Sequence, residues 1–442
     1  MSFRARIRTC VTWLLVIATG VATTPLLSAP SVAQAAPVLP ALPNVYLNTT
    51  YAPPSGRTIF VPAGGDFQGA LNAAQPGEVI SLQAGATFTG PFTLPNKPGA
   101  GWIYVRTSAP DSTLPPPGTR IDPSYASLMP KIVVGGAQWN YVIQSASGAH
   151  HYRFVGVEIA PTPGTYLFTL IELGNPSNNI IFDRSYIHGD PGVGSRWGID
   201  LGGASEAVVD SYISAMTSTS DPDTHGISVW DSPGPIKIVN NYIEASGENI
   251  NFGGQDPSQQ GLVPSDIEIR GNYLFKPLSW YVHSSTYAGT HWGVKNLFEM
   301  KNARRALIDG NIMENNWADQ QDGFAIQFTP RNQSGGCPWC IVADITFTHN
   351  IVRHTRAGVH IIGTDNNQPS QPLQRLLMQN NLFADVGAFP GGTGPCCPPG
   401  LLVLMDNGTS QNVTFDHNTV LQTNNEFNVN DPQAGLVITN NI

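Results

Sequence analysis

Short runs of alternating apolar and polar residues recur along the chain from about residue 150 onward, for example IIFDRS, IKIVNN, IEIRGN, ITFTHN and VTFDHN. Each run leads to a Ser or Asn and then to apolar residues. These recurring positions are Ser185, Ser211, Asn241, Asn272, Asn311, Asn350, Asn381 and Asn418. Alternation with a period of two predicts β-strands that bury one face. A short repeat with insertions of variable length is typical of a solenoid.

We therefore predict an all-β fold, a right-handed parallel β-helix with Ser and Asn stacked at one corner. Stacked Asn side chains can bond to each other and to the turn backbone. A β-sandwich of hairpins fits poorly, because the chain lacks two-residue hairpin turn sequences. Before the repeats, FQGALNAAQPGEVISLQ predicts a helix at 67–74 and a strand at 78–83. That helix would cap the first rung.

A second strand recurs once per rung, as TLIELGN, GIDLGG, GISVWDS, NINFGGQ, LFEMKN, FAIQFTP and GVHIIGT. Aligning the inward apolar residues predicts one outward polar column, made of Glu172, Asp200, Ser228, Asn251, Glu299, Gln327 and His360. Adjacent rungs of a sheet lie about 4.8 Å apart, so successive members would be neighbours. Flanking glycines predict a shallow groove beside this column, with Lys301 next to it.

The longest insertions lie between residues 272 and 311 and between 311 and 350, on either side of this region. Long loops beside a rigid sheet are where binding usually occurs. We expect loop aromatics to offer ring faces to sugars, or else simply to shield the sheet. The predicted substrate-binding residues are Trp230, Asn251, Trp280, Trp292, Gln327 and His360.

The N-terminal residues 1–35 are predicted to be a signal peptide. Three arginines precede an apolar run at 11–22, which is too short to cross about 30 Å of hydrocarbon. We expect a secreted protein, extracellular or periplasmic, with a Pro-rich lead-in at 36–60 and a β-helix domain at 61–442. The last rung has no capping segment, which predicts that the C-terminal end is truncated or is covered by a partner.

Charge and cysteine content narrow the class of protein. The net charge is −9 and only 12% of residues are charged, which argues against a nucleic-acid partner. Beyond the predicted signal peptide, four cysteines remain: Cys337, Cys340, Cys396 and Cys397. In an exported chain they predict disulfides with three possible pairings, and a four-thiolate zinc site is the alternative.

The segment ALNAAQPGEVISLQAG and the run LFEMKN…GNIMENN…FAIQF resemble secreted β-helix enzymes of the pectate-lyase-like superfamily, especially the alginate lyase and chondroitinase B family. The resemblance implies β-elimination at a uronic acid by a Lys base, with an Arg on the next rung and calcium on the substrate carboxylate. Lys301 stands at the Lys position. The Arg position falls on Thr329, two residues before Arg331. Asn251 and Glu299 stand for the calcium ligands, although the family's paired Glu motif is missing.

The implied chemistry needs a base for the proton at C5, beside a carboxylate whose charge must be neutralised by calcium or Arg. We expect Lys301 to be the base, helped by Arg331 and Arg305, which would favour its neutral form, whereas Glu299 would oppose this. The expected partner is a polysaccharide that contains uronic acid, and calcium is the candidate cofactor.

Two other classes of function stay open. A glycoside hydrolase would use two carboxylates from neighbouring rungs; the candidates are Asp200, Asp231, Glu248 and Glu299. A non-catalytic carbohydrate-binding or surface β-helix is the third class, because the fold does not choose among functions. A lyase would gather Lys301, an Arg and an Asn/Glu cluster in one groove. A hydrolase would show two carboxylates across a cleft, without a basic partner.

Overall fold

The computed structural model describes residues 38–391 and 398–442, and within them most strands belong to three parallel sheets. Sheet A pairs, in order, β1 (Thr58–Val61), β2 (Val79–Leu82), β5 (Ile103–Thr107), β8 (His150–Val155), β11 (Asn178–Asp183), β14 (Glu206–Val209), β17 (Ile236–Val239), β20 (Ser265–Arg270), β23 (Ala303–Asp309), β26 (Val342–Thr348), β29 (Gln374–Gln379), β32 (Gln411–Asp416) and β35 (Val437–Thr439).

Sheet B pairs β3 (Thr87–Thr89), β6 (Lys131–Val134), β9 (Glu158–Pro161), β12 (Tyr186–His188), β15 (Tyr212–Met216), β18 (Tyr242–Ala245), β21 (Tyr273–Phe275), β24 (Ile312–Asn316), β27 (Ile351–Thr355), β30 (Leu382–Val386) and β33 (Thr419–Gln422). Sheet C pairs β4 (Phe92–Leu94), β7 (Ile143–Ser145), β10 (Thr169–Leu173), β13 (Trp197–Leu201), β16 (His225–Val229), β19 (Glu248–Phe252), β22 (Asn296–Met300), β25 (Phe324–Phe328), β28 (Ala357–Ile362), β31 (Val403–Asp406) and β34 (Phe427–Val429).

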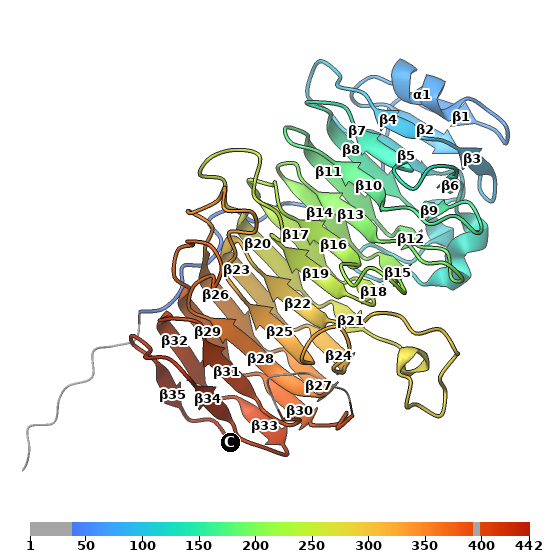
Figure 1. Cartoon of the computed structure of the whole chain (residues 1–442). Coiled ribbons are helices and arrows are strands. Elements are labelled where there is room, and N and C mark those ends of the chain that lie inside the picture. The colour runs from blue at the N-terminus through green and yellow to red at the C-terminus, as the bar shows by residue number, and fades with distance from the viewer. Residues whose placement is uncertain (1–37, 392–397) are drawn as a thin grey trace, which may run out of the picture. The chain divides into compact units, whose positions relative to one another are not determined.

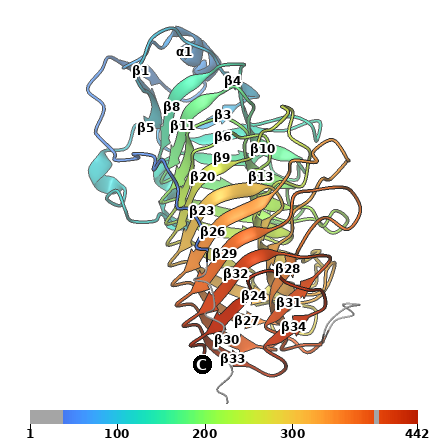
Figure 2. The ribbon, with the colours of Figure 1, turned by 90° about the vertical axis from the view of Figure 1, so that its left-hand side faces the viewer.

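Each full turn of the chain adds one strand to each sheet, as β22, β23 and β24 do before β25 returns to sheet C. Strands of one kind therefore stack rung upon rung, as Figures 1 and 2 show. The predicted right-handed parallel β-helix is confirmed. Its interior is a continuous stack of apolar side chains, for example Ile227, Ile250, Phe298 and Ile326 on successive strands of sheet C.

The predicted ladder of Ser and Asn lies at the corner between sheets A and B, and all its members are buried. Each backbone N–H bonds to the side-chain oxygen of the next member. Asn272 N–H donates to Asn311 Oδ1 at 2.9 Å, and Asn311 N–H donates to Asn350 Oδ1 at 2.9 Å. Each Asn amide group also donates to a backbone carbonyl of the rung before, as Asn311 Nδ2 does to Ile269. The ladder therefore fixes rung spacing as well as the turn.

The predicted capping helix is α1 (Phe67–Ala73), which begins where Asp66 accepts a hydrogen bond from Gly69 N–H at 2.7 Å. Phe67 and Leu71 are buried against the first rungs, and α1 packs on β4. Three short 3₁₀ helices lie in insertions: η1 (Asp111–Thr113), η2 (Pro123–Leu128) and η3 (Leu278–Trp280). The segment that contains η3 projects from the stack between β21 and β22 (Figure 1).

Residues 38–57 run along the outside of sheet A against the direction in which the rungs stack. Ala41 N–H bonds to Asp344, Asn44 N–H bonds to Asp266, and Lys237 and Arg153 donate to the carbonyls of Leu47 and Thr49. The predicted signal peptide and Cys396–Cys397 lie outside the described residues. In the part of the chain that is described, no helix has the length and apolar character needed to span a bilayer.

Candidate active site

The predicted polar column exists on sheet C. Strand register places Glu172 beside Asp200, Asp200 beside Ser228, and Ser228 beside Asn251. It continues through Glu299, Gln327 and His360 in the same register. Alternation within each strand was therefore enough to predict which side chains share this face.

A cleft of about 410 Å³ opens beside the middle of the column. It is lined by Arg196, Trp197, Asp223, His225, Asn251, Gly253, Gly254, Gln255, Lys295, Lys301 and Gln333. Gly253 is needed here: its φ is +89°, and a Cβ would approach the Cβ of Lys301 to 2.9 Å. Of the glycines that flank the predicted column, Gly253 is the one that lines this cleft.

A second outward column, which the sequence analysis missed, lies at the beginning of the same strands. Trp197, His225, Glu248 and Asn296 are successive neighbours in register. Simple alternation would turn Trp197 and His225 inward with Ile199 and Ile227. Alternation fails because the next position, Gly226, faces the crowded interior, where a Cβ would meet Asn249 O at 2.7 Å. The glycines that open the segments GIDLGG and GISVWDS were the sequence feature from which this break in alternation could have been predicted.

Glu248 is the centre of an ion-pair cluster and is 0% exposed. Its Oε1 lies 2.5 Å from Lys295 Nζ, and its Oε2 lies 3.0 Å from His225 Nε2. Lys295 Nζ also lies 2.6 Å from Asp223 Oδ1. Burial opposes the charge of Glu248, but Lys295, His225 and Lys301 together hold its pKa well below the usual range. Burial likewise opposes the charge of Lys295, yet Glu248, Glu299 and Asp223 raise its pKa, so Lys295 stays an ammonium.

Lys301 follows β22 and points its amine into the cleft beside two glutamates. Its Nζ lies 3.4 Å from Glu299 Oε2 and 4.0 Å from Glu248 Oε1, so it is held more loosely than Lys295. Glu299 is itself anchored, because its oxygens accept hydrogen bonds from Thr329 Oγ1 and Asn296 Nδ2 at 2.8 and 3.0 Å. Thr329, which holds the expected arginine position, therefore positions Glu299.

The two arginines expected to assist Lys301 lie elsewhere. Arg331 bonds through its backbone N–H to the carbonyl of Lys301, but its guanidinium turns to Asp365 at 3.1 Å. Arg305 lies on sheet A, where it pairs with Asp266 at 2.7 Å beneath the N-terminal lead-in. The arginine that lines the cleft is Arg196, which was not predicted. It lies 4.8 Å over the Trp197 ring and pairs with Asp221 at 2.7 Å.

The predicted sugar platforms, Trp280 and Trp292, are only 8% and 6% exposed. They form an apolar cluster with Val294 of the same insertion, with Trp317 of the loop after β24 and with Phe389 of the loop after β30. Little of either ring is therefore open to a sugar, because both rings supply apolar contacts between the insertion and its neighbouring loops. Trp197 is the tryptophan in the cleft, and its ring stacks on His225 with centroids 5.1 Å apart.

The other predicted binding residues are distributed along the column. Asn251 lines the cleft, and its buried Oδ1 has no hydrogen-bond partner among the described residues. Gln327 donates to Gln321 at 2.6 Å, and His360 pairs with Asp406 at 2.9 Å. Trp230 directly follows β16, and its Nε1 donates to Asp200 at 2.8 Å. The structure therefore brings Asn251 and Lys301 together and leaves the other three outside the cleft lining.

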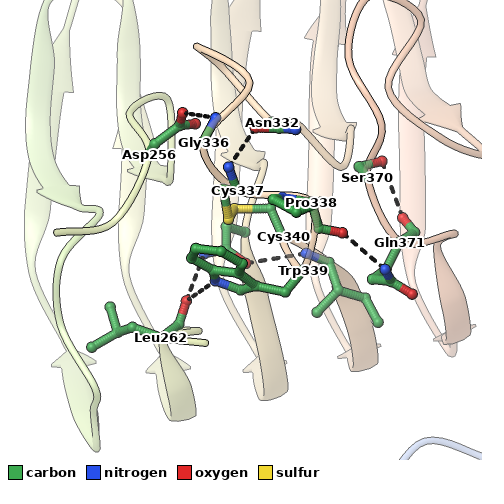
Figure 3. The surroundings of a disulfide bond; sticks show 12 residues. Asp256, Leu262, Asn332, Gly336, Cys337, Pro338, Trp339, Cys340, Ser370 and Gln371 are labelled. Atoms are coloured by element: carbon green, nitrogen blue, oxygen red, sulfur yellow. Dashed lines mark hydrogen bonds between the residues drawn. A yellow bond between two sulfur atoms is a disulfide. The ribbon is translucent and has the colours of Figure 1, made fainter. Parts of the chain in front are cut away.

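The loop that carries Gln333 to the cleft contains a disulfide between Cys337 and Cys340 (Figure 3). Around it, Gly336 N–H donates to Asp256 and Trp339 Nε1 donates to Leu262 O, both on the loop between β19 and β20. This pairing removes two of the four thiolates that the alternative zinc site required. Both sulfur-bearing residues are fully buried, which is consistent with a structural bond.

Two acidic residues of the column, Glu172 and Asp200, lie side by side in register and outside the cleft lining. Asp200 is 2% exposed, and its Oδ1 has no hydrogen-bond partner among the described residues. Burial raises the pKa of Glu172 to about 7. Burial, and then the charge of Glu172, raise the pKa of Asp200 well above its usual range. The pair thus favours a protonated form at neutral pH.

This pair predicts a pH dependence of stability. The pKa of Glu172 is higher in the folded chain than its ordinary value of 4.5. The contribution of Glu172 to the stability of the folded chain is therefore complete below about pH 4.5 and is lost as the pH rises through about 7. We expect the melting temperature to fall by a few degrees between pH 5 and 8, and to fall less in Glu172→Gln. If the melting temperatures of the native chain and of Glu172→Gln fell equally between pH 5 and 8, this expectation would be contradicted.

Among the described residues, one group of side chains has the spacing of a metal site: Asp223, His225 and Glu248, whose donor atoms lie within 4.8 Å of one another. Calcium takes about six to eight oxygen ligands. Here one donor is an imidazole nitrogen, and Lys295 already lies against both carboxylates. The expected ligand Glu299 is engaged by Thr329 and Asn296. As arranged, these residues do not fit calcium.

No family model matches the chain, and no curated protein matches it. Among solved structures, it is similar to the pectate lyase Pel9A (16% identity, 78% of this chain and 82% of that chain, TM-score 0.44). It is also similar to a polygalacturonase from Erwinia carotovora ssp. carotovora (13%, 89% and 96%, 0.39) and to an alginate lyase from Paenibacillus sp. str. FPU-7 (12%, 87% and 98%, 0.34). These likenesses concern the fold alone.

Proposed function

We propose that the protein is a polysaccharide lyase that cleaves a uronate-containing chain by β-elimination in the cleft around Lys301. The observation that carries this proposal is the convergence of Arg196, Lys295 and Lys301 with Asn251 in one cleft. A uronate carries its negative charge next to the proton that must leave, so cations in the site favour both binding and reaction. The cleft differs from a hydrolase site in having basic partners beside its carboxylates.

Lys301, rather than Lys295, is assigned as the base. Lys295 is held at 2.5 and 2.6 Å by two carboxylates and stays charged, so it cannot accept a proton. Lys301 has only the longer contacts to Glu299 and Glu248. The neutral amine of Lys301 would take the C5 proton and become an ammonium, which these two glutamates would then stabilise. The electron pair left at C5 forms the C4–C5 double bond as the C4–O bond breaks, and the leaving oxygen takes a proton from solvent.

Arg196 is assigned to the substrate carboxylate in place of Arg331 and Arg305. Its guanidinium lines the cleft and is braced by Trp197 and Phe168 at 4.8 and 5.6 Å. A planar guanidinium binds a carboxylate through two parallel hydrogen bonds. Asn251 Oδ1, buried without a partner among the described residues, is an acceptor for a sugar hydroxyl.

The first test incubates the protein with alginate, pectate and glycosaminoglycans and follows the ultraviolet absorbance of unsaturated uronate products. We expect a product from one of these polymers, and we expect a calcium chelator to leave the rate unchanged, because Lys295 supplies the fixed cation. Loss of activity on chelation, with recovery on adding calcium, would contradict the assignment of Lys295 as the fixed cation of the site. Absence of the chromophore with every polymer would contradict the lyase itself.

A second candidate function, glycoside hydrolysis, is favoured by the Glu172–Asp200 pair. A hydrolase needs a carboxyl group that keeps its proton at neutral pH, and Glu172, with a pKa of about 7, meets that need. Reducing ends would then appear without the ultraviolet chromophore. Glu172→Gln would abolish their release, and Lys301→Ala would not. The opposite result favours the lyase.

A further inference from the structure

The ammonium of Lys295 lies where a metal ion would lie. Asp223, His225 and Glu248, here called the cation cradle, bring two carboxylates and an imidazole within 4.8 Å of one another. Lys295 Nζ is 2.6 Å from Asp223 Oδ1 and 2.5 Å from Glu248 Oε1. Both distances are close to the roughly 2.3–2.6 Å of calcium–oxygen bonds, so the ammonium fills the gap that an ion would need.

The chain is built so that Lys295 reaches this position. It directly precedes β22, and its backbone N–H bonds to Ser246 O on the turn that leads into Glu248. Its side chain then extends past Glu248 to Asp223, two rungs earlier, and is only 8% exposed. Asp223 is fixed in turn, since its backbone carbonyl accepts a hydrogen bond from Trp197 Nε1 at 2.8 Å.

Charge makes the ammonium necessary. Asp223, Glu248 and Glu299 contribute three negative charges, which Lys295 and Lys301 offset in part. Without Lys295, the fully buried Glu248 would keep only His225 at 3.0 Å and Lys301 at 4.0 Å. A buried carboxylate with so little compensation is costly, and a divalent ion would restore the balance.

We propose that the ammonium of Lys295 occupies the position in the cation cradle where a metal ion would otherwise bind. The native chain then binds no metal ion there, whereas a chain without this ammonium binds one. The donor set of one imidazole and two carboxylates suits a first-row divalent ion such as zinc or cobalt better than calcium. This inference stands independently of the proposed lyase activity, because it concerns metal binding alone.

The test is calorimetric titration of zinc into the full chain without substrate. We expect Lys295→Ala to bind one zinc ion per chain, with Lys295→Ala/His225→Ala losing that site. Lys301→Ala is the matched control: it removes a lysine from the same cluster but leaves Lys295 in the cradle, so it should titrate like the native chain. Cobalt should give visible absorption bands in Lys295→Ala and not in Lys301→Ala.

A native chain that binds zinc with loss of binding in Glu248→Gln would overturn the proposal, as would a folded Lys295→Ala that binds none. If Lys295→Ala does not fold alone, refolding it with zinc decides the same question, because an ion that binds only the folded form stabilises it. Recovery of the native circular dichroism supports the proposal. Failure to recover the native circular dichroism, together with a Lys295→Gln variant that folds but binds no zinc, overturns the proposal. None of these readouts requires the protein to be an active lyase.

Discussion

Lys301→Ala is expected to lower kcat on the uronate polymer by about a thousandfold, within the range for removing a positioned base. The physical reason is that no other amine in the cleft can take over. Lys295 Nζ is held between Asp223 and Glu248 and stays protonated, and Arg196 is always charged. The measurement is the initial rate of formation of the unsaturated product at saturating substrate, with KM determined alongside.

Two further variants and a chemical rescue separate a base from a structural lysine. Lys131→Ala is the matched control, because Lys131 forms an ion pair with Glu158 at 2.9 Å on sheet B and should keep full activity. Lys301→Arg keeps the positive charge but cannot accept a proton, so it should be as inactive as Lys301→Ala. Small primary amines added to Lys301→Ala should restore part of the rate. Full activity in Lys301→Arg would show that charge, and not proton transfer, is what the position supplies.

Arg196→Ala should raise KM more than it lowers kcat, if its guanidinium binds the substrate carboxylate in both ground and transition states. Arg305→Ala tests the assignment made from sequence, because Arg305 lies on sheet A beside Asp266. An equal loss of activity in Arg305→Ala would contradict the present location of the site.

The fold could be predicted because two of its rules are local. Strand alternation selected the inward side chains, and Asn272, Asn311 and Asn350 recur where a corner needs an amide. The outward column on sheet C followed from the same alternation, and its register agrees residue by residue from Glu172 to His360.

The rest of the site could not be predicted, because it depends on contacts that alternation does not encode. Gly226 breaks the alternation of β16, so alternation alone does not place His225 on the outward face. Lys295 precedes its strand and reaches Asp223 across 72 residues of sequence. Arg305 is close to Lys301 in sequence, yet the corner between β22 and β23 carries it to another sheet.

Asn311→Ala is expected to lower the free energy of unfolding by about 3–4 kcal/mol, the largest loss of stability predicted for an uncharged residue. Asn311 Oδ1 accepts from both the N–H and the side-chain amide of Asn272, each at 2.9 Å. Its own Nδ2 donates to Ile269 O at 3.0 Å and to Asn350 Oδ1 at 2.9 Å. Alanine would leave the buried N–H of Asn272 without a partner, which costs more than the bonds themselves contribute. Chemical denaturation measures the loss, and hydrogen exchange of the Asn272 amide locates it.

The ladder itself supplies the control. Ser211 performs the same acceptor role two rungs before Asn272, taking the N–H of Ser185 on its Oγ at 3.0 Å. Asn311→Ser keeps an acceptor for Asn272 N–H and gives up only the amide donors, so its loss should be about half that of alanine. Because each rung contacts only its neighbours, faster exchange in Asn311→Ala should be confined to the rungs around β20, β23 and β26. Equal losses for serine and alanine would mean that the amide donors, rather than the buried acceptor, hold the corner together.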